Sequence, residues 1–87
     1  QNPPQILILE MHQVINLDTT GLDTLRAIQT FLQKHQAQLL LCAVTNQPLD
    51  LMQRSGFLTE LGENRVFPDL DEALSYLAFQ LNQPPTL

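Results

Sequence analysis

The chain has 87 residues and is 44% hydrophobic, and its nine acidic and four basic residues give a net charge of −5. This composition predicts a single small globular domain, residues 1–87, with an ordered core over about residues 5–83 between the proline pairs at 3–4 and 84–85. The acidic balance excludes nucleic acid as a partner, and no apolar run approaches the roughly 18 residues that cross a bilayer. Cys42, the only cysteine, is expected to be a buried strand residue of a protein from a reducing compartment.

The first half of the chain predicts a strand, a helix and a second strand. Residues 5–11 form a short apolar run, which suits a strand buried on both faces. Apolar residues then recur every three or four positions over residues 22–34, which is typical of one face of a helix. Residues 38–44 are apolar without alternation and predict a second buried strand. Two such strands joined by one helix are expected to be parallel, with a right-handed crossover.

The second half predicts shorter elements. A helix is expected over residues 49–55, and Gly56 supplies the left-handed conformation that ends it. Residues 57–61 predict a following half-turn, and residues 65–67 predict an edge strand. Asp69 is expected to cap a last helix, whose apolar face is formed by Leu70, Ala73, Leu74, Leu77 and Leu81. The whole order predicts an α/β fold, with mainly parallel strands and helices packed on the sheet.

The strongest local signal is Asp18-Thr19-Thr20-Gly21, which lies between the first apolar run and the first helix. One interpretation is a helix cap, in which Thr20 accepts a hydrogen bond from an amide near Asp23 and Gly21 allows a tight turn. Asp18 and Asp23 bracket the motif, and either is an alternative cap or orienting group. The other is an exposed Thr20 hydroxyl that a kinase modifies, since the amides of a helix N-terminus favour a phosphate.

Candidate residues for other chemistry are few. Thr45 and Asn46 follow the second strand and are expected at the same carboxyl edge as residues 18–21, where α/β sheets place ligands. His12 and His35 have no histidine or cysteine at ligand spacing, so no metal site is predicted. No nucleophile–base pair, phosphate loop or Rossmann glycine pattern occurs, so neither a catalytic residue nor a cofactor is predicted.

Several segments, in order along the chain, resemble the STAS domains, which are named for sulfate transporters and anti-sigma factor antagonists. Residues 6–9 followed by 14–22 resemble the family's central strand, conserved loop and helix start. Residues 51–57 resemble its Ser-Gly-Leu/Phe helix end, and residues 66–74 resemble the Phe-Pro-x-x-x-Glu-Ala segment before its last helix. The resemblance covers roughly residues 5–81 and implies a STAS-type sheet.

The branch of this family bears on function. Anti-sigma antagonists usually carry Asp-Ser-Ser-Gly with the second serine phosphorylated, and Thr20 occupies the matching position. SulP and SLC26-type anion transporters commonly have threonine there, together with the Phe-Pro-x-x-x-Glu-Ala ending. The resemblance therefore implies a non-enzymatic regulatory and structural domain at the C-terminus of a SulP-family transporter, with sulfate as the expected anion. Its expected place is the cytoplasmic face of the inner or plasma membrane, beside the transmembrane part of its own transporter.

The resemblance also implies further partners. These are a second copy in a homodimer, a cytosolic protein or a nucleotide, with the ligand or partner loop formed by Asp18, Thr19, Thr20, Gly21, Thr45 and Asn46. Two alternatives stay open. One is a stand-alone anti-sigma factor antagonist switched by phosphorylation of Thr20, and the other is a STAS sensor of a small ligand.

The chain departs from the family pattern at its start. Family members begin with about two more strands, and no segment here matches them, so one edge of the sheet is expected to be open. An unpaired edge invites pairing with another chain. The alternative is that the open edge has no role and reflects only how much of a longer protein is present.

Overall fold

The computed structural model describes residues 5–82, which form an alternating series of strands and helices. In chain order these are β1 (Gln5–Glu10), α1 (Thr19–Lys34), β2 (Ala37–Cys42), α2 (Asn46–Arg54), α3 (Phe57–Leu61), the 3-10 turn η1 (Glu63–Arg65), β3 (Val66–Phe67) and α4 (Leu70–Leu81). The proline pairs predicted as domain boundaries lie outside the described residues.

The three strands form one parallel sheet in the order β1-β2-β3. Ile8 lies beside Leu40 in the long β1–β2 ladder, and Cys42 lies beside Phe67 in the short β2–β3 ladder. The predicted parallel pairing of two strands around one helix is therefore confirmed, as is the short edge strand at Val66–Phe67. A parallel ladder needs a crossover of this kind, because a tight turn cannot return the chain to the same end of the sheet.

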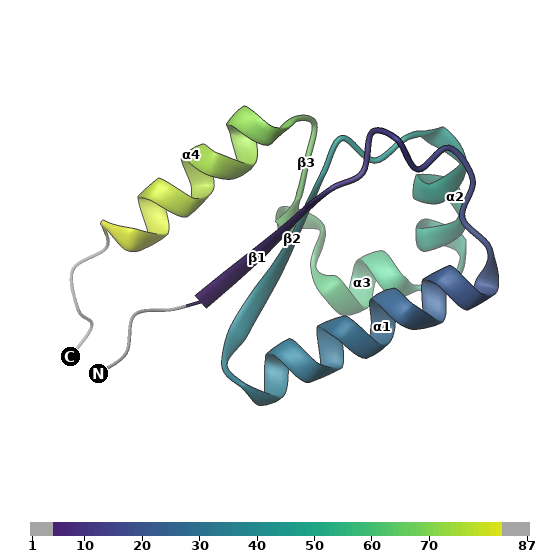
Figure 1. Cartoon of the computed structure of the whole chain (residues 1–87), viewed down its shortest axis with the longest axis horizontal. Coiled ribbons are helices and arrows are strands. Elements are labelled where there is room, and N and C mark those ends of the chain that lie inside the picture. The colour runs from purple at the N-terminus through teal and green to yellow at the C-terminus, as the bar shows by residue number, and fades with distance from the viewer. Residues whose placement is uncertain (1–4, 83–87) are drawn as a thin grey trace.

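The sheet separates two unequal layers, with α1 and α4 on opposite sides of the strands (Figure 1). Leu39 and Leu41 of β2 belong to the main hydrophobic core, with buried residues of α1, α2 and α3. The intervening Gln38 accepts a long hydrogen bond from the Tyr76 hydroxyl of α4 at 3.5 Å. Alternation along the strand thus turns odd-numbered residues of β2 toward the main core and even-numbered ones toward α4.

The two long strands differ in burial. Leu39, Leu40 and Leu41 of β2 are fully buried, as predicted. The prediction that the first strand is buried on both faces was wrong, because Leu7 of β1 is 39% exposed. β1 is an edge strand, and among the described residues no further strand lies beyond it. A continuous apolar run in the sequence indicates a strand, but it does not show whether that strand lies at the centre or at the edge of its sheet.

Helix ends largely follow the predicted signals. Gly56 has φ +85° and joins α2 to α3, so the predicted left-handed helix end is confirmed. The Asp69 carboxylate accepts a hydrogen bond from the Glu72 amide at 2.8 Å, which confirms the predicted cap of α4. Both α1 and α2 begin three residues before the predicted start, at Thr19 and Asn46.

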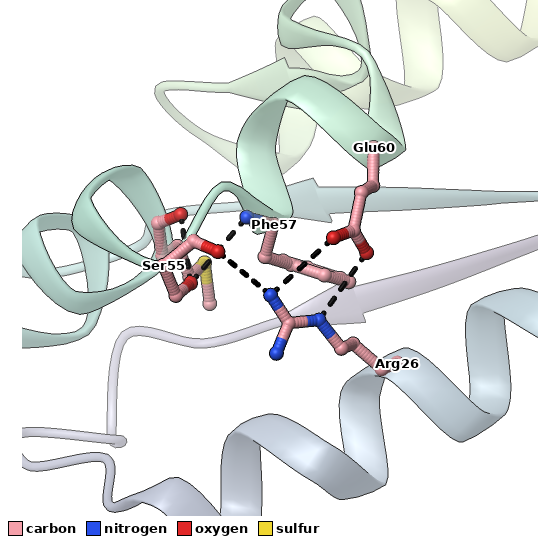
Figure 2. A network of polar contacts seen from close by, with 5 residues as sticks. Arg26, Ser55, Phe57 and Glu60 are labelled. Carbon is pink, nitrogen blue, oxygen red and sulfur yellow. Dashed lines mark hydrogen bonds and ion pairs between the residues drawn. The ribbon is translucent and has the colours of Figure 1, made fainter.

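A polar network fixes α1 against the α2–α3 corner (Figure 2). Arg26 Nη2 donates to the Ser55 carbonyl oxygen at 2.8 Å, and Nε donates to Glu60 Oε1 at 3.2 Å. The Ser55 hydroxyl donates in turn to the Met52 carbonyl at 3.1 Å, and the Phe57 amide donates to the same hydroxyl at 3.4 Å. The helix end that resembles the family's Ser-Gly-Phe pattern is thus the point where α1, α2 and α3 are held together.

Candidate functional site: the loop at the carboxyl end of the sheet

The segment that leads from β1 to α1 crosses the carboxyl end of the sheet and runs beside α2 (Figure 1). Two residues at the start of α2 hold it there. The Thr45 hydroxyl donates to the Val14 carbonyl oxygen at 2.8 Å. Thr45 is the N-cap residue of α2, but its side chain makes no hydrogen bond to that helix, because its hydroxyl donates to the loop.

Gln47 forms the second attachment. Its Oε1 accepts from the Leu17 amide at 2.7 Å, and its Nε2 donates to the Leu17 carbonyl oxygen at 3.0 Å. One primary amide thus satisfies both backbone groups of a loop residue that lies outside any helix or strand ladder. Gln47 was not predicted as a site residue, because only its nearness to Thr45 and Asn46 in the sequence pointed to this edge.

The cap of α1 is Asp18. Its Oδ1 accepts from the Gly21 amide at 2.8 Å, and its backbone is extended, as an N-cap residue requires. The prediction that Thr20 caps the helix was wrong, because Thr20 already lies within the first helical turn. Its carbonyl oxygen instead accepts from the Thr24 hydroxyl at 3.1 Å.

Gly21 also serves a purpose other than the predicted one. Its φ is not among the positive values in the chain, so no tight turn requires glycine here. A Cβ at this position would lie 2.7 Å from Leu17 Cδ1 and 3.4 Å from Asp18 Oδ1. The missing side chain therefore lets Leu17 pack closely over the first turn of α1.

The structure brings most of the predicted loop residues to one corner. Thr19 and Thr20 are exposed in the first turn of α1, and Thr45 contacts the loop through its hydroxyl. Asn46 is exposed as the first residue of α2, and none of the hydrogen bonds found within residues 5–82 joins it to the loop. The predicted placement at a shared carboxyl edge thus holds for Asp18 and Thr45, whereas Asn46 lies beside the contact without taking part.

Below this corner, at the β1 side of α1, lies an open hollow of about 350 Å³. Its wall is mostly apolar and is formed by Leu9, Glu10, Met11, Val14, Leu17, Gly21, Thr24 and Leu25. The loop that carries Leu17 and Val14 therefore forms one side of the hollow while α2 holds it from the other side. No sequence pattern predicted this hollow.

Charged groups near the loop are mainly acidic. Glu10 lies at the end of β1, with its Oε1 at 2.5 Å from His12 Nδ1, and the carboxylates of Asp18 and Asp23 flank the first turn of α1. Burial raises the pKa of the Cys42 thiol above its ordinary value, and the charges of Glu10 and Asp69 raise this pKa further. Cys42 is thus an inert core thiol, as expected from its apolar run.

Neither a metal cluster nor a membrane span is found in the part of the chain that the structure describes. Residues 5–82 contain no group of three histidine, cysteine, aspartate or glutamate side chains placed to hold a metal ion. None of the helices within this range combines the length and the apolar character needed to cross a membrane.

Comparison with known proteins identifies the family of this chain. The family model described as the STAS domain matches residues 1–73. The chain belongs to the STAS domain family. This match includes β1, the loop and the start of α1, so the resemblance of residues 14–22 to the family's conserved loop is confirmed at the level of the family.

Solved structures show how closely this STAS domain follows its relatives. A sulfate transporter family protein from Wolinella succinogenes matches with a TM-score of 0.87 at 35% identity, over 92% of this chain and 66% of that one. The STAS domain of a SulP transporter from Vibrio cholerae matches with a TM-score of 0.83 at 29% identity, over 92% of this chain and 62% of that one. The α/β fold with helices packed on a parallel sheet is thus confirmed.

Curated relatives of the STAS domain are much longer proteins. Putative sulfate transporter YvdB of Bacillus subtilis is 29% identical over 83% of this chain and 14% of its own length. Sulfate transporter 1.1 of Arabidopsis thaliana is 24% identical over 94% of this chain and 13% of its own length. The chain therefore corresponds to a small part of the sulfate transporters that it resembles.

Proposed function

We propose that this STAS domain is the cytoplasmic C-terminal part of a SulP-family anion transporter, with sulfate as the expected anion. Its role in the proposal is regulatory and structural rather than enzymatic: it stabilises the transporter and offers a surface to partners. The observation that carries the proposal is the similarity to sulfate transporters and to a SulP STAS domain along most of the chain. Thr20 and the Phe67-Pro68 ending, typical of the transporter branch, support it.

The geometry of the loop fits a structural and binding role. Thr45 and Gln47 hydrogen-bond to backbone groups of the loop, and Asp18 caps the first turn of α1. The exposed groups at the corner include the hydroxyls of Thr19 and Thr20, in the first turn of α1, and the side-chain amide of Asn46, at the start of α2. A rigid loop with exposed hydroxyls at a helix N-terminus suits the binding of a protein surface or an anionic group.

The proposal is tested with the complete gene that encodes this sequence. We expect expression of the gene in a bacterium without its own sulfate uptake to restore accumulation of radiolabelled sulfate. Deletion of residues 1–87 should lower both uptake and the amount of protein in the membrane, whereas an inert tag placed after residue 87 should change neither. Unchanged uptake and membrane abundance after the deletion would contradict the proposed role of the domain.

A second candidate function is a phosphorylation switch at Thr20, as in the anti-sigma antagonists. The exposure of Thr20 in the first turn of α1 favours it, because a kinase needs an accessible hydroxyl. A phosphate there would lie near the carboxylates of Asp18 and Asp23 and would add to the net charge of −5. The added negative charge would weaken the binding of a partner at this acidic corner by like-charge repulsion. Mass spectrometry of the protein from its native cells should detect phosphorylated Thr20 if this function operates. Its absence, together with a transporter-sized chain, would remove the candidate.

A further inference from the structure

The peptide group that joins Cys42 to Ala43 lies where β2 ends, and it is bonded to the chain on both sides of that strand. Its carbonyl oxygen, which belongs to Cys42, accepts from the Met11 amide at 2.9 Å, just beyond the end of β1. Its amide, which belongs to Ala43, donates to the Phe67 carbonyl oxygen of β3 at 3.1 Å. One planar peptide group thus joins the end of β1 to the end of β3 across the central strand.

This peptide group is held in an unfavourable backbone conformation. Ala43 has φ +57°, in the left-handed region, which alanine rarely occupies because its Cβ lies too close to the following carbonyl oxygen. Turning the peptide plane about its flanking bonds would bring Ala43 to a negative φ, and both hydrogen bonds would be lost together. The fully buried Cys42 side chain need not move in that turn. The two bonds therefore hold the strained arrangement as one unit.

Further hydrogen bonds connect this peptide group to the loop. The Met11 carbonyl oxygen accepts from the Val14 amide at 3.0 Å, and the Val14 carbonyl oxygen accepts from the Thr45 hydroxyl at 2.8 Å. Thr45 follows Ala43 by two residues, so these bonds and the chain itself form a closed circuit between the end of β2 and the loop. A change in any bond of this circuit alters the support of the peptide group.

On its other side the peptide group is bonded to the strand that leads into α4. Phe67 is the last residue of β3, and its ring packs against the Tyr76 ring of α4 with the two centroids 5.3 Å apart. Asp69, which caps α4, follows Phe67 by two residues. The carbonyl oxygen that the Ala43 amide holds therefore belongs to a residue that positions α4 on the sheet.

We propose that the Cys42–Ala43 peptide group is a two-state joint that couples the loop to the junction of β3 and α4. In the closed state, which the structure shows, both hydrogen bonds are formed and Ala43 is strained. In the open state the peptide plane has turned, the strain is relieved, and the ends of β1 and β3 are released together. A partner that holds the loop in place would stabilise the closed state, and the start of α4 would respond. The inference does not depend on the transporter proposal.

Amide hydrogen exchange of the 87-residue chain tests the joint, because each of its two bonds protects one amide proton. Ala43→Gly removes the left-handed penalty and should raise the protection factors of the amides at positions 11 and 43 by one common factor, about fivefold or more. The Leu9 amide, further inside β1, should change less.

The matched control is Gln36→Gly. Gln36 also has a left-handed φ, +59°, but it precedes β2 and so lies at the opposite end of that strand. Relief of its strain should leave the protection factors of the Met11 and Ala43 amides within about twofold of wild type. Equal effects of Ala43→Gly and Gln36→Gly on these amides would overturn the proposal, because exchange would then follow unfolding of the whole domain. Unchanged protection in Ala43→Gly would overturn it as well.

A further variant tests the coupling from the side of the loop. Thr45→Val keeps nearly the same side-chain shape but removes the donor to the Val14 carbonyl oxygen. We expect it to lower the protection factor of the Ala43 amide as much as that of the Met11 amide, by about fivefold, although the Ala43 amide is bonded to β3. Lowered protection at Met11 alone would contradict the joint, because the two bonds would then open separately.

Discussion

Gln47 holds Leu17 through both of its backbone groups, although 30 residues separate them in the sequence. The two bonds, 2.7 and 3.0 Å long, join the start of α2 to the last part of the loop before the Asp18 cap. Since Leu17 also packs against Gly21, this one side chain links α2, the loop and the first turn of α1. This corner of the STAS domain is therefore held by Gln47, an exposed residue that was not among the predicted site residues.

Replacement of Gln47 should loosen the loop. Gln47→Ala removes both bonds to Leu17 and is expected to lower the free energy of unfolding by about 1–2 kcal/mol, measured by urea denaturation. Gln47→Glu keeps an acceptor for the Leu17 amide but cannot donate to its carbonyl oxygen, so an intermediate loss is expected. Gln53→Ala, at an exposed position of the same helix, is the control and should cost little. Equal effects of the changes at 47 and 53 would refute the clamp.

The assignment of Asp18 as the cap of α1 predicts how strongly changes at positions 18 and 20 lower the stability of the domain. Asp18→Ala removes the acceptor for the Gly21 amide and should cost about 1 kcal/mol of unfolding free energy, whereas Asp18→Asn should cost less. Thr20→Ala should have a smaller effect than Asp18→Ala, because Thr20 lies inside the helix. Thermal unfolding of the three variants gives the ranking. A larger loss for Thr20→Ala would show that the threonine is the cap.

Gln29 provides a test in which a substitution is expected to stabilise the domain. Its side chain lies in α1 and is 5% exposed, and its amide nitrogen and oxygen lack hydrogen-bond partners within residues 5–82. Gln29→Met retains the length of the side chain and removes the buried polar group, so the free energy of unfolding should rise by about 1 kcal/mol. Gln33→Met, exposed on the same helix, is the control. A destabilised Gln29→Met protein would indicate that an ordered water or another group satisfies the amide.

The raised pKa of Cys42 predicts that the stability of the domain depends on pH. Because burial and the charges of Glu10 and Asp69 raise its pKa in the folded state, the folded chain holds the thiol proton more tightly than the unfolded chain. The contribution of this thiol to the free energy of unfolding is fully present below the ordinary thiol pKa, and it is lost as the pH rises through the raised pKa of the folded state. Between about pH 7 and about pH 10, wild type should therefore lose more unfolding free energy than Cys42→Ala does. Parallel pH profiles for the two proteins would contradict the raised pKa.

Local patterns in the sequence predicted the order of the elements because those elements depend on local chemistry. Gly56 marks a helix end by its backbone freedom, and Asp69 caps α4 through an amide three residues away. The sequence did not decide between Thr20 and Asp18 as the cap of α1, because both carry an oxygen suited to capping and only the backbone angles separate them. The clamp by Gln47 depends on tertiary contact and leaves no periodic signal.

The edge strand β1 and the hollow beside it also show that local sequence patterns do not predict features that depend on tertiary packing. The apolar run that includes Leu7 predicted a strand, and the departure from the family pattern predicted an open edge, which the strand order within residues 5–82 confirms. Neither observation predicted the hollow beside it, whose wall combines β1, the loop and α1. Sites of this kind arise where elements meet, so they become visible only when the packing is known.

The size and location of the native protein test the central proposal most directly. Antibodies against this STAS domain, applied to separated membrane and soluble fractions of the native cells, should detect a membrane-bound chain several times longer than 87 residues. That length is expected because this chain corresponds to between 12% and 14% of the curated transporters that it resembles. A soluble chain of about the size of the domain alone would contradict the transporter assignment and favour the anti-sigma antagonist.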